Sequence, residues 1–367
     1  MKILVTGKLA DRNFFYHTYP ITLLESVEEI MVVRDTEGIK SNKITYYCPP
    51  VWTLKIPPLA FIYKFILMMY LSISKNPSFI YGYLLFPHAS LAFLVGKLTN
   101  KKVGISLIAG PVELFSSGSP IDDYSYCDPL PKLNLRAKIF AWILRSSDLV
   151  TVTGSYTKDF LTSIGINKEK IFILYHTVDE RFKDEDTEKE YDIVYVGRLG
   201  KVKHVSTIIK SVKIIKKRIS NLRVAIVGDG NCKFELKSLS KKLGVDKNVD
   251  FVGYQKNVED WYNKSKIFVL TSEREGFPYT VIESLKCGVP VITSDCGDVC
   301  DLIEDGYNGF FIDNYYDYEA FADKIIEILE NDKLLERLSD NSLESIDNIN
   351  PDNLSIVWKD IFSFLSK

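Results

Sequence analysis

Residues 271–290 read TSEREGFPYTVIESLKCGVP, and their hydrophobic pattern predicts a strand, a short loop and a helix. The strand ends at Thr271, and helical spacing runs from about Thr280 to Cys287 before Gly288 ends the helix. Val289–Thr293 follows at once as a second run of apolar, β-branched residues. Strands that alternate with helices over such short connections indicate a parallel sheet covered on both faces.

This alternation extends over the whole chain. In the first half the predicted strands are Lys2–Thr6, Ile30–Val33, Phe79–Tyr83, Val103–Ile108, Leu149–Thr153 and Ile171–Tyr175. In the second half they are Asp192–Val196, Arg223–Val227, Val249–Val252, Ile267–Thr271, Val289–Thr293 and Phe310–Ile312. The predicted fold class is therefore α/β, with two doubly wound Rossmann-like domains that face an interdomain cleft.

The length of 367 residues agrees with two domains, since one domain usually holds about 100–200 residues. We expect an N-terminal Rossmann-like domain over residues 1–182 and a C-terminal one over residues 191–348. The acidic stretch at 183–190, KDEDTEKE, is interpreted as a solvated linker. Residues 349–367 are expected to form a last helix whose apolar face packs back on the N-terminal domain.

The composition excludes several classes of protein. A net charge of −2 argues against a strongly basic nucleic-acid-binding surface. The six cysteines lie at positions 48, 127, 232, 287, 296 and 300, with no C-x-x-C pair and no zinc-ligand spacing. We therefore expect reduced thiols in a cytoplasmic protein and no metal site. The N-terminal MKILVTG reaches a glycine too early for a secretory signal.

Charge is distributed unevenly along the chain. Residues 38–112 contain eight lysines and no Asp or Glu. Within them, Leu59–Ile73 carries a single charge, so a helix there would be apolar almost all round. Two interpretations remain open: a core helix with lysines at its rim, or a membrane-facing helix or groove whose lysines attract anionic lipid. The uncharged window 76–96 has glycine, proline and histidine near its middle, and we interpret it as a strand, a loop and a helix.

A candidate anion site follows the first predicted strand of the second half. Residues 193–204 read IVYVGRLGKVKH, where the strand ends at Gly197 and Arg198 and Lys203 precede the next helix. Glycine lets the backbone approach a ligand, and two cations at a helix N-terminus suit a diphosphate. The alternative is a capped turn with solvated cations.

A second glycine turn follows the next strand. Residues 223–231 read RVAIVGDGN, in which Gly228 and Gly230 come directly after the apolar run. The third glycine of a dinucleotide fingerprint is replaced by Lys233, which argues against a nicotinamide dehydrogenase. We interpret the turn as one that lines the cleft.

Two carboxylates lie eight residues apart in the stretch quoted first. Glu275 lies in the loop over the helix N-terminus, and Glu283 lies about one turn inside the helix. Burial of Glu283 requires hydrogen-bond donors, which a ribose diol could supply. The free backbone N–H groups around Tyr279–Val281 could take a phosphate. The alternative is a capping carboxylate and an exposed helix glutamate.

At these residues the sequence resembles the retaining glycosyltransferases of the GT-B fold, family 4. The spacing from Glu275 to Glu283 matches their E-x7-E motif in the form E-G-F-P-x-x-x-x-E. The G-R-L turn with Lys203 matches as well, as do V-G-D-G at 227–230, V-x-F-x-G at 249–253 and C-G-x-P-V-I at 287–292. The resemblance covers about residues 185–315 by motif and the rest by architecture.

The resemblance implies roles for single residues. Arg198 and Lys203 would bind the donor diphosphate and stabilise the leaving nucleotide, and Glu275 would contact hydroxyls of the donor sugar. These three residues are the catalytic candidates, and Glu283 would bind the ribose. The other donor-binding residues that the resemblance implies are Gly197, Gly228, Gly276, Phe277, Pro278, Thr280 and Val281.

The implied reaction transfers a sugar from a nucleoside-diphosphate sugar, such as a UDP- or GDP-sugar, with retention and without metal or cofactor. The C-terminal domain would bind this donor. The N-terminal domain would bind the acceptor, a hydroxyl of a glycan or a lipid-linked glycan in surface polysaccharide assembly. The expected location is the cytoplasm, peripheral to the inner face of the membrane, with an anionic membrane surface and no nucleic acid among the partners.

The first half departs from the family pattern. A glycine pair after the first strand is reduced to Gly7, and a frequent histidine is replaced by the segment SLIAGPVE, which contains Gly110. His88, in an earlier loop, is the remaining histidine candidate. We therefore consider Gly7, His88 and Gly110 for the acceptor side. The departures leave open an inactive homologue that acts as a partner or scaffold, and also a different GT-B reaction such as epimerisation or phosphorolysis.

Overall fold

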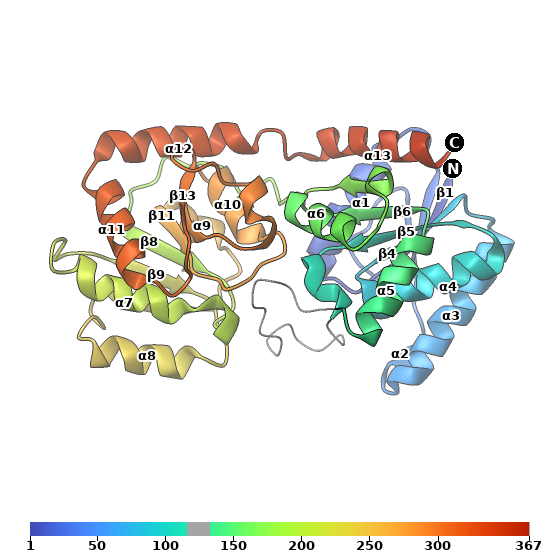
Figure 1. The fold of residues 1–367 in the computed structure, drawn as a ribbon, viewed down its shortest axis with the longest axis horizontal. Coiled ribbons are helices and arrows are strands. Elements are labelled where there is room, and N and C mark those ends of the chain that lie inside the picture. Colours follow the sequence, from blue (N-terminus) through green and yellow to red (C-terminus); the bar gives the residue numbers. More distant parts are fainter. Residues whose placement is uncertain (116–132, 367) are drawn as a thin grey trace. The chain divides into compact units, whose positions relative to one another are not determined.

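The computed structural model describes residues 1–115 and 133–366, and the chain divides into two compact units. Unit 1 consists of Met1–Thr177 and Ile349–Lys367, and unit 2 consists of Val178–Asn348. Each unit contains one parallel sheet with helices packed against it (Figure 1). Cys127, one of the six cysteines, lies outside the described residues.

The acidic stretch 183–190 is part of unit 2 and is not a linker between the units. Its side chains are mostly exposed, as expected, but its main chain is hydrogen-bonded to Asn263. Glu185 N donates to Asn263 Oδ1 at 3.0 Å, and Asn263 Nδ2 donates to Lys183 O at 3.1 Å. These hydrogen bonds attach the stretch to unit 2, so the chain passes between the units at residues 177 and 178 and the expected boundary at 182 lies inside unit 2.

The sheet of unit 1 has seven parallel strands in the order β3-β2-β1-β4-β5-β6-β7. The strands are β1 (Lys2–Thr6), β2 (Glu29–Val33), β3 (Ile44–Tyr47), β4 (Phe79–Tyr83), β5 (Lys102–Leu107), β6 (Leu149–Val152) and β7 (Ile171–Ile173). The direction of winding reverses between β1 and β4, which is the point where such sheets bind ligands. The sequence analysis missed β3, because this edge strand has four residues of which only Ile44 is buried.

Helices cover both faces of this sheet. One face packs against α1 (Asp11–Thr22) and α13 (Pro351–Leu365), and the other against α3 (Pro57–Ser74), α4 (Ser90–Thr99), α5 (Leu135–Ser146) and α6 (Ser155–Ser163). The short helix α2 (Val51–Leu54) precedes α3. The C-terminal helix α13 thus belongs to the core of unit 1, where Trp358 is 2% exposed and its ring lies 5.2 Å from that of Tyr81.

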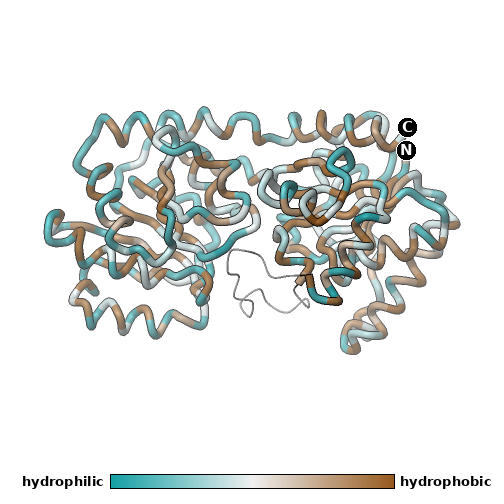
Figure 2. The backbone as a smooth tube through the Cα atoms, viewed as in Figure 1, coloured by the Kyte–Doolittle hydropathy of each residue, from teal (hydrophilic) through white to brown (hydrophobic). Residues whose placement is uncertain are grey.

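Helix α3 has two apolar faces. Met68 and Leu71 are buried in the core against the sheet, while most of the other residues are partly or fully exposed. By length and composition alone this helix could cross a membrane, and 28% of it is buried. Figure 2 shows it largely brown, the colour of hydrophobic residues, along its length. The window 76–96 forms β4, the irregular turn Leu85–Ala89 and α4, so it is a strand, a loop and a helix as expected.

The sheet of unit 2 has six parallel strands in the order β10-β9-β8-β11-β12-β13. The strands are β8 (Tyr191–Val196), β9 (Val224–Val227), β10 (Val249–Gly253), β11 (Ser265–Leu270), β12 (Val291–Ser294) and β13 (Gly309–Ile312). The helices are α7 (Val205–Ile215), α8 (Lys233–Lys242), α9 (Glu259–Asn263), α10 (Tyr279–Lys286), α11 (Tyr318–Leu329) and α12 (Asp332–Ile346). Winding reverses between β8 and β11, so the turns after these two strands lie side by side at the ligand-binding edge.

Candidate active site

The two turns at the reversal point of unit 2 are hydrogen-bonded to each other. Glu273 N, after β11, donates to Val202 O, after β8, at 2.9 Å. Thr271 Oγ1 donates to Lys203 O at 3.0 Å. The sequence analysis assigned one turn to a diphosphate and the other to a sugar, and these bonds hold the two in a fixed relation.

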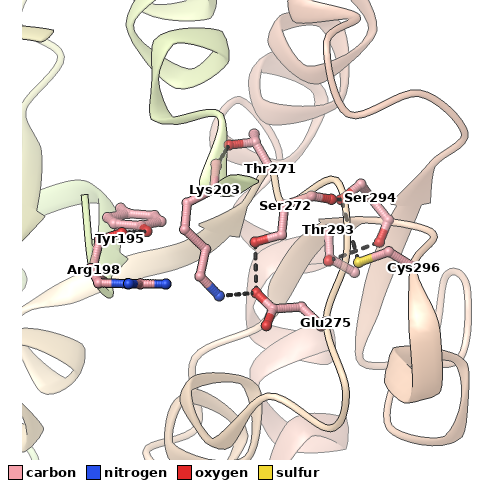
Figure 3. A network of polar contacts seen from close by, with 9 residues as sticks. All are labelled: Tyr195, Arg198, Lys203, Thr271, Ser272, Glu275, Thr293, Ser294 and Cys296. Carbon is pink, nitrogen blue, oxygen red and sulfur yellow. Dashed lines mark hydrogen bonds and ion pairs between the residues drawn. The ribbon is translucent and has the colours of Figure 1, made fainter. Parts of the chain in front are cut away.

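The pair formed by Lys203 and Glu275 lies at the centre of this site. Lys203 Nζ lies 2.5 Å from Glu275 Oε1, and the same oxygen accepts from Ser272 Oγ at 2.6 Å. Figure 3 shows the side chains of Arg198 and Lys203 directed toward the same space, with Glu275 on the far side of Lys203. The side chains of Lys203 and Glu275 are 20% and 11% exposed, so the pair is shielded from water but not closed off from a ligand. Arg198 is exposed.

Glycines shape the turn that carries Arg198. A Cβ on Gly228 would lie 1.9 Å from Gly197 O, and one on Gly230 would lie 2.5 Å from Leu199 O. Tyr195 supports the same turn, because its buried hydroxyl donates to Arg198 O at 3.0 Å. The V-G-D-G turn therefore acts on the site indirectly. Its glycines have no Cβ, so the Gly197–Leu199 backbone can pack directly against this turn.

Glu283 faces a tyrosine inside unit 2. Its Oε2 accepts from Tyr262 Oη at 3.1 Å, and burial raises the pKa of Tyr262 well above its usual value. Glu283 is partly buried, and the hydrogen bond from Tyr262 offsets part of the free energy lost when its carboxylate is removed from water. At the start of α10, Val281 N donates to Pro278 O at 3.1 Å and Val281 is buried, so its amide is not free for a phosphate as the sequence analysis expected. Thr280 is partly exposed on the first turn of α10.

The loop between Glu275 and α10 is fixed from a third turn. Gly297, after β12, has a φ of +60°, and a Cβ there would lie 2.0 Å from Glu275 O. Asp298 N donates to Gly276 O at 3.0 Å. Phe277 and Pro278 are both buried, so they anchor the loop in the core.

Sequence reasoning missed the residues that support the site from behind. Ser272 and Tyr262 hold the two glutamates, and Gly297 lets the β12 turn approach Glu275. Signals existed for Ser272, directly after the predicted strand that ends at Thr271, and for Gly297, a glycine in the loop after the next predicted strand. Among residues 1–115 and 133–366, no group of three or more His, Cys, Asp or Glu side chains could hold a metal ion.

In unit 1, Gly7 and His88 follow the two strands at the reversal point. His88 Nδ1 lies 3.5 Å from Thr6 Oγ1, which donates to Val33 O at 2.9 Å. Burial, followed by the charge of Lys64, lowers the pKa of His88 to about 4, so the ring is neutral at pH 7. A Cβ on Gly7 would lie 2.8 Å from Tyr83 Cβ, so Gly7 allows the chain to pass close to β4.

Gly110 opens a short 3-10 turn, Gly110–Leu114, that positions a buried carboxylate, Glu113. Glu113 Oε1 accepts from Ile108 N at 2.6 Å and Ala109 N at 2.7 Å, and Oε2 accepts from Leu85 N at 2.7 Å. Burial raises the pKa of Glu113 to about 7, against the effect of these three donors. Glu113 thus joins the loops that follow β4 and β5, and the sequence analysis did not identify it.

Comparisons with known proteins show what this chain is similar to. Residues 177–345 match the model of the family described as glycosyl transferases group 1, which covers almost all of unit 2. The chain is 26% identical over 284 residues to N-acetyl-alpha-D-glucosaminyl L-malate synthase of Bacillus anthracis, covering 74% of this chain and 70% of that protein. It is 27% identical over 231 residues to the capsular polysaccharide biosynthesis glycosyltransferase CapM of Staphylococcus aureus, covering 63% of this chain and 58% of that protein.

A solved structure extends the likeness to both units. HepE of Anabaena in complex with UDP superposes with a TM-score of 0.77 at 14% identity, over 99% of this chain and 100% of that one. This likeness shows the fold: the chain has the GT-B architecture of two parallel-sheet, Rossmann-like domains, as the sequence analysis expected. Together with the family match, it supports a glycosyltransferase.

Proposed function

We propose that this chain is a retaining glycosyltransferase of group 1 that moves a sugar from a nucleoside-diphosphate sugar to a hydroxyl of a glycan or lipid-linked acceptor. The relatives named above include a capsular polysaccharide enzyme, and HepE was crystallised with UDP. We extend this to the present chain as assembly of a surface polysaccharide. Assignment to family 4, with Glu275 and Glu283 as its E-x7-E pair, is part of the proposal.

One observation carries it: a lysine and a glutamate from two turns at the reversal point of unit 2 meet at 2.5 Å, with Arg198 directed to the same space. Two cations there can neutralise a diphosphate, Arg198 as a fork and Lys203 as a point charge. The amides of Tyr279 and Thr280 at the start of α10 add a partial positive charge. The proposal therefore requires no metal.

The two glutamates bind the ribose and the donor sugar, respectively Glu283 and Glu275. Glu283, oriented by Tyr262, accepts hydrogen bonds from the ribose hydroxyls. Glu275 keeps one carboxylate oxygen on Lys203 and Ser272, and its other oxygen can accept from a hydroxyl of the donor sugar. In this way the group that binds the phosphate also orients the group that binds the sugar, which favours a single geometry of the donor.

The reaction follows from this placement. The bond between the anomeric carbon and the β-phosphate oxygen breaks, and negative charge develops on that oxygen beside Lys203 and Arg198. The acceptor hydroxyl attacks the same face of the anomeric carbon, and its proton passes to the departing phosphate oxygen. The configuration is retained. This same-face step forms no covalent bond to Glu275, whose Oε1 contacts Lys203 and Ser272 and whose Oε2 is assigned to a sugar hydroxyl.

We assign the acceptor to unit 1, at the strand ends that carry Gly7, His88 and Gly110. His88 is neutral at pH 7 because burial lowers its pKa, so one ring nitrogen can accept a hydrogen bond from the acceptor. Glu113 would act through the loops after β4 and β5 and would not itself contact the acceptor.

Donor binding tests the proposal first. Calorimetry with UDP, GDP, ADP and dTDP and their sugars, without and with magnesium, should show tight metal-free binding of one nucleotide. Glu283→Ala should weaken that binding. Nuclear magnetic resonance of the glycoside formed with an added acceptor should then show the anomeric configuration of the donor.

Each alternative has its own result. Binding that requires magnesium would contradict the metal-free mechanism. A product formed without any acceptor would indicate an epimerase, and one formed from phosphate a phosphorylase. No binding of any nucleotide, together with unchanged cellular function of Glu275→Ala and Glu283→Ala variants, would favour an inactive homologue that acts as a scaffold.

A further inference from the structure

We propose that the outer surface of α3, with α2 and the adjoining face of α4, docks on an anionic lipid bilayer. We define this surface as the α3 face: the exposed apolar residues Trp52, Ile56, Ile62, Ile66, Tyr70 and Ile73. The inference concerns unit 1 alone and does not depend on the donor chemistry of unit 2.

The α3 face is a continuous stripe. Ile62, Ile66, Tyr70 and Ile73 are spaced by four, four and three residues, so they lie on one side of the helix. Ile66, Tyr70 and Ile73 are 60%, 63% and 70% exposed, and Trp52, on α2, is 62% exposed. Isolated exposed apolar residues are common on soluble proteins, but a stripe from Ile62 to Ile73 along one side of an 18-residue helix indicates a partner.

The neighbouring helices extend the apolar area. Leu94 and Leu98 are exposed on α4, which packs beside α3. On α5, Trp142 is exposed and its ring lies 5.6 Å from that of Phe93 on α4. Figure 1 shows α2, α3, α4 and α5 grouped in one region of unit 1.

The exposed charges at the ends of α3 and on α4 are lysines. Lys64, the single charge within α3, is directed inward and its Nζ donates to Asp35 Oδ1 at 2.8 Å, so it does not interrupt the apolar stripe. Lys55 and Lys75 are exposed at the two ends of α3, and Lys97 is exposed on α4. Because residues 38–112 contain no Asp or Glu, an anionic surface would meet no carboxylate of this segment.

The structure favours contact of the α3 face with a bilayer surface over two alternatives, a dimer contact and a membrane-spanning α3. A second copy of this chain would bring the same lysines together across a twofold axis, which is repulsive. Insertion of α3 across the membrane would remove Met68 and Leu71 from the core of unit 1. An exposed apolar stripe with cations at its ends, and with aromatic rings at Trp52 and Tyr70, suits contact with the interface of an anionic bilayer.

Flotation with vesicles of phosphatidylglycerol and phosphatidylcholine, compared with phosphatidylcholine alone, tests the proposal on the full chain. We expect binding to the anionic vesicles that weakens as salt is raised. The affinity of the variant Ile62→Ser/Ile66→Ser/Tyr70→Ser for the anionic vesicles should be lower by a factor of about ten or more. Ile356→Ser removes an exposed apolar residue of α13, on the other side of the sheet, and should float like the wild type.

Two further single variants test the charges without changing the apolar stripe. Lys55→Gln and Lys75→Gln should each lower binding to anionic vesicles by about fivefold. Wild-type flotation of the triple serine variant, or no flotation of the wild-type chain, would overturn the proposal. So would a concentration-dependent dimer that the serine variant abolishes. Nucleotide binding measured without vesicles reports separately on the proposed transferase activity.

Discussion

Lys203 Nζ and Glu275 Oε1 lie 2.5 Å apart, although the two residues belong to turns that follow different strands, β8 and β11. The resemblance assigned one residue to the phosphate and the other to the sugar. Their contact makes these two roles a single unit: removing either side chain leaves the other partly buried charge without this partner. Substitutions at the two positions should therefore not be additive.

Lys203→Ala should lower kcat by about 10²–10³-fold, because it removes charge from the leaving phosphate and releases Glu275. Steady-state turnover of the donor sugar measures this. Lys201→Ala is the matched control, since Lys201 lies in the same turn and is exposed. Wild-type turnover in Lys203→Ala would reject the diphosphate assignment. The double variant Lys203→Ala/Glu275→Ala should lose less than the product of the two single losses.

Glu283→Ala should weaken nucleotide binding by about 10–100-fold, since it removes a carboxylate that accepts hydrogen bonds from the ribose. Tyr262→Phe should cause a smaller loss, because it leaves the carboxylate but removes the hydroxyl 3.1 Å from it. Calorimetry with the preferred nucleoside diphosphate measures both. Equal affinities in the wild type and Glu283→Ala would remove Glu283 from the donor site.

Gly228→Ala should lower the free energy of unfolding of unit 2 by about 1–3 kcal/mol, because its Cβ would lie 1.9 Å from Gly197 O. The shift of the Gly197–Leu199 turn should also weaken nucleotide binding. Gly244→Ala is the matched control, since Gly244 has a φ of +69° but no heavy atom within 4 Å of a Cβ. It should cost about 1 kcal/mol from the backbone alone and leave nucleotide binding unchanged. Thermal unfolding of Gly228→Ala and Gly244→Ala, each with and without nucleotide, measures both the stability and the nucleotide binding of the two variants.

Acidification should destabilise unit 1 through His88. Burial lowers the pKa of His88 to about 4, so between this value and 6.5 the unfolded chain binds a proton that the folded chain does not. This contribution to the free energy of unfolding is complete above pH 6.5 and falls by about 1.4 kcal/mol per pH unit below it. The wild-type chain should therefore lose stability between pH 6.5 and 4.5 faster than His88→Asn. If the free energy of unfolding fell equally with pH in the wild type and His88→Asn, a lowered pKa of His88 would be contradicted.

The strands were predictable where apolar runs are long and bounded by turn residues. Every predicted strand is present, with ends that differ by at most a few residues, and only the edge strand β3 was missed. The helix α3 illustrates the limit of the method: its apolar pattern is the same on both faces, so the sequence could not tell the face that packs on the sheet from the exposed one. Only the positions of Met68 and Leu71 in the core decide this.

The meeting of Lys203 and Glu275 was predictable from the sequence, whereas the residues that support them were not, and contact of either with a donor stays a prediction. Arg198, Lys203, Glu275 and Glu283 follow strands or open a helix, and parallel topology brings such positions together. Tyr262 and Glu113 could not be found in this way, because each acts through a hydrogen bond to a segment distant in sequence. The role of residues 183–190 was misjudged for the same reason, as their bonds to Asn263 leave no local pattern.

Unit 2 is inserted, in covalent terms, into unit 1, because the chain returns to the first sheet at Ile349. The ring of Tyr81 on β4 is covered by Trp358 on α13, so this part of the first sheet cannot be completed on the ribosome until residues 351–365 have been synthesised. During translation, unit 2 can fold while one face of the first sheet is still open and apolar. The nascent chain should therefore expose apolar surface of the first sheet until α13 emerges, and shortening α13 should favour aggregation.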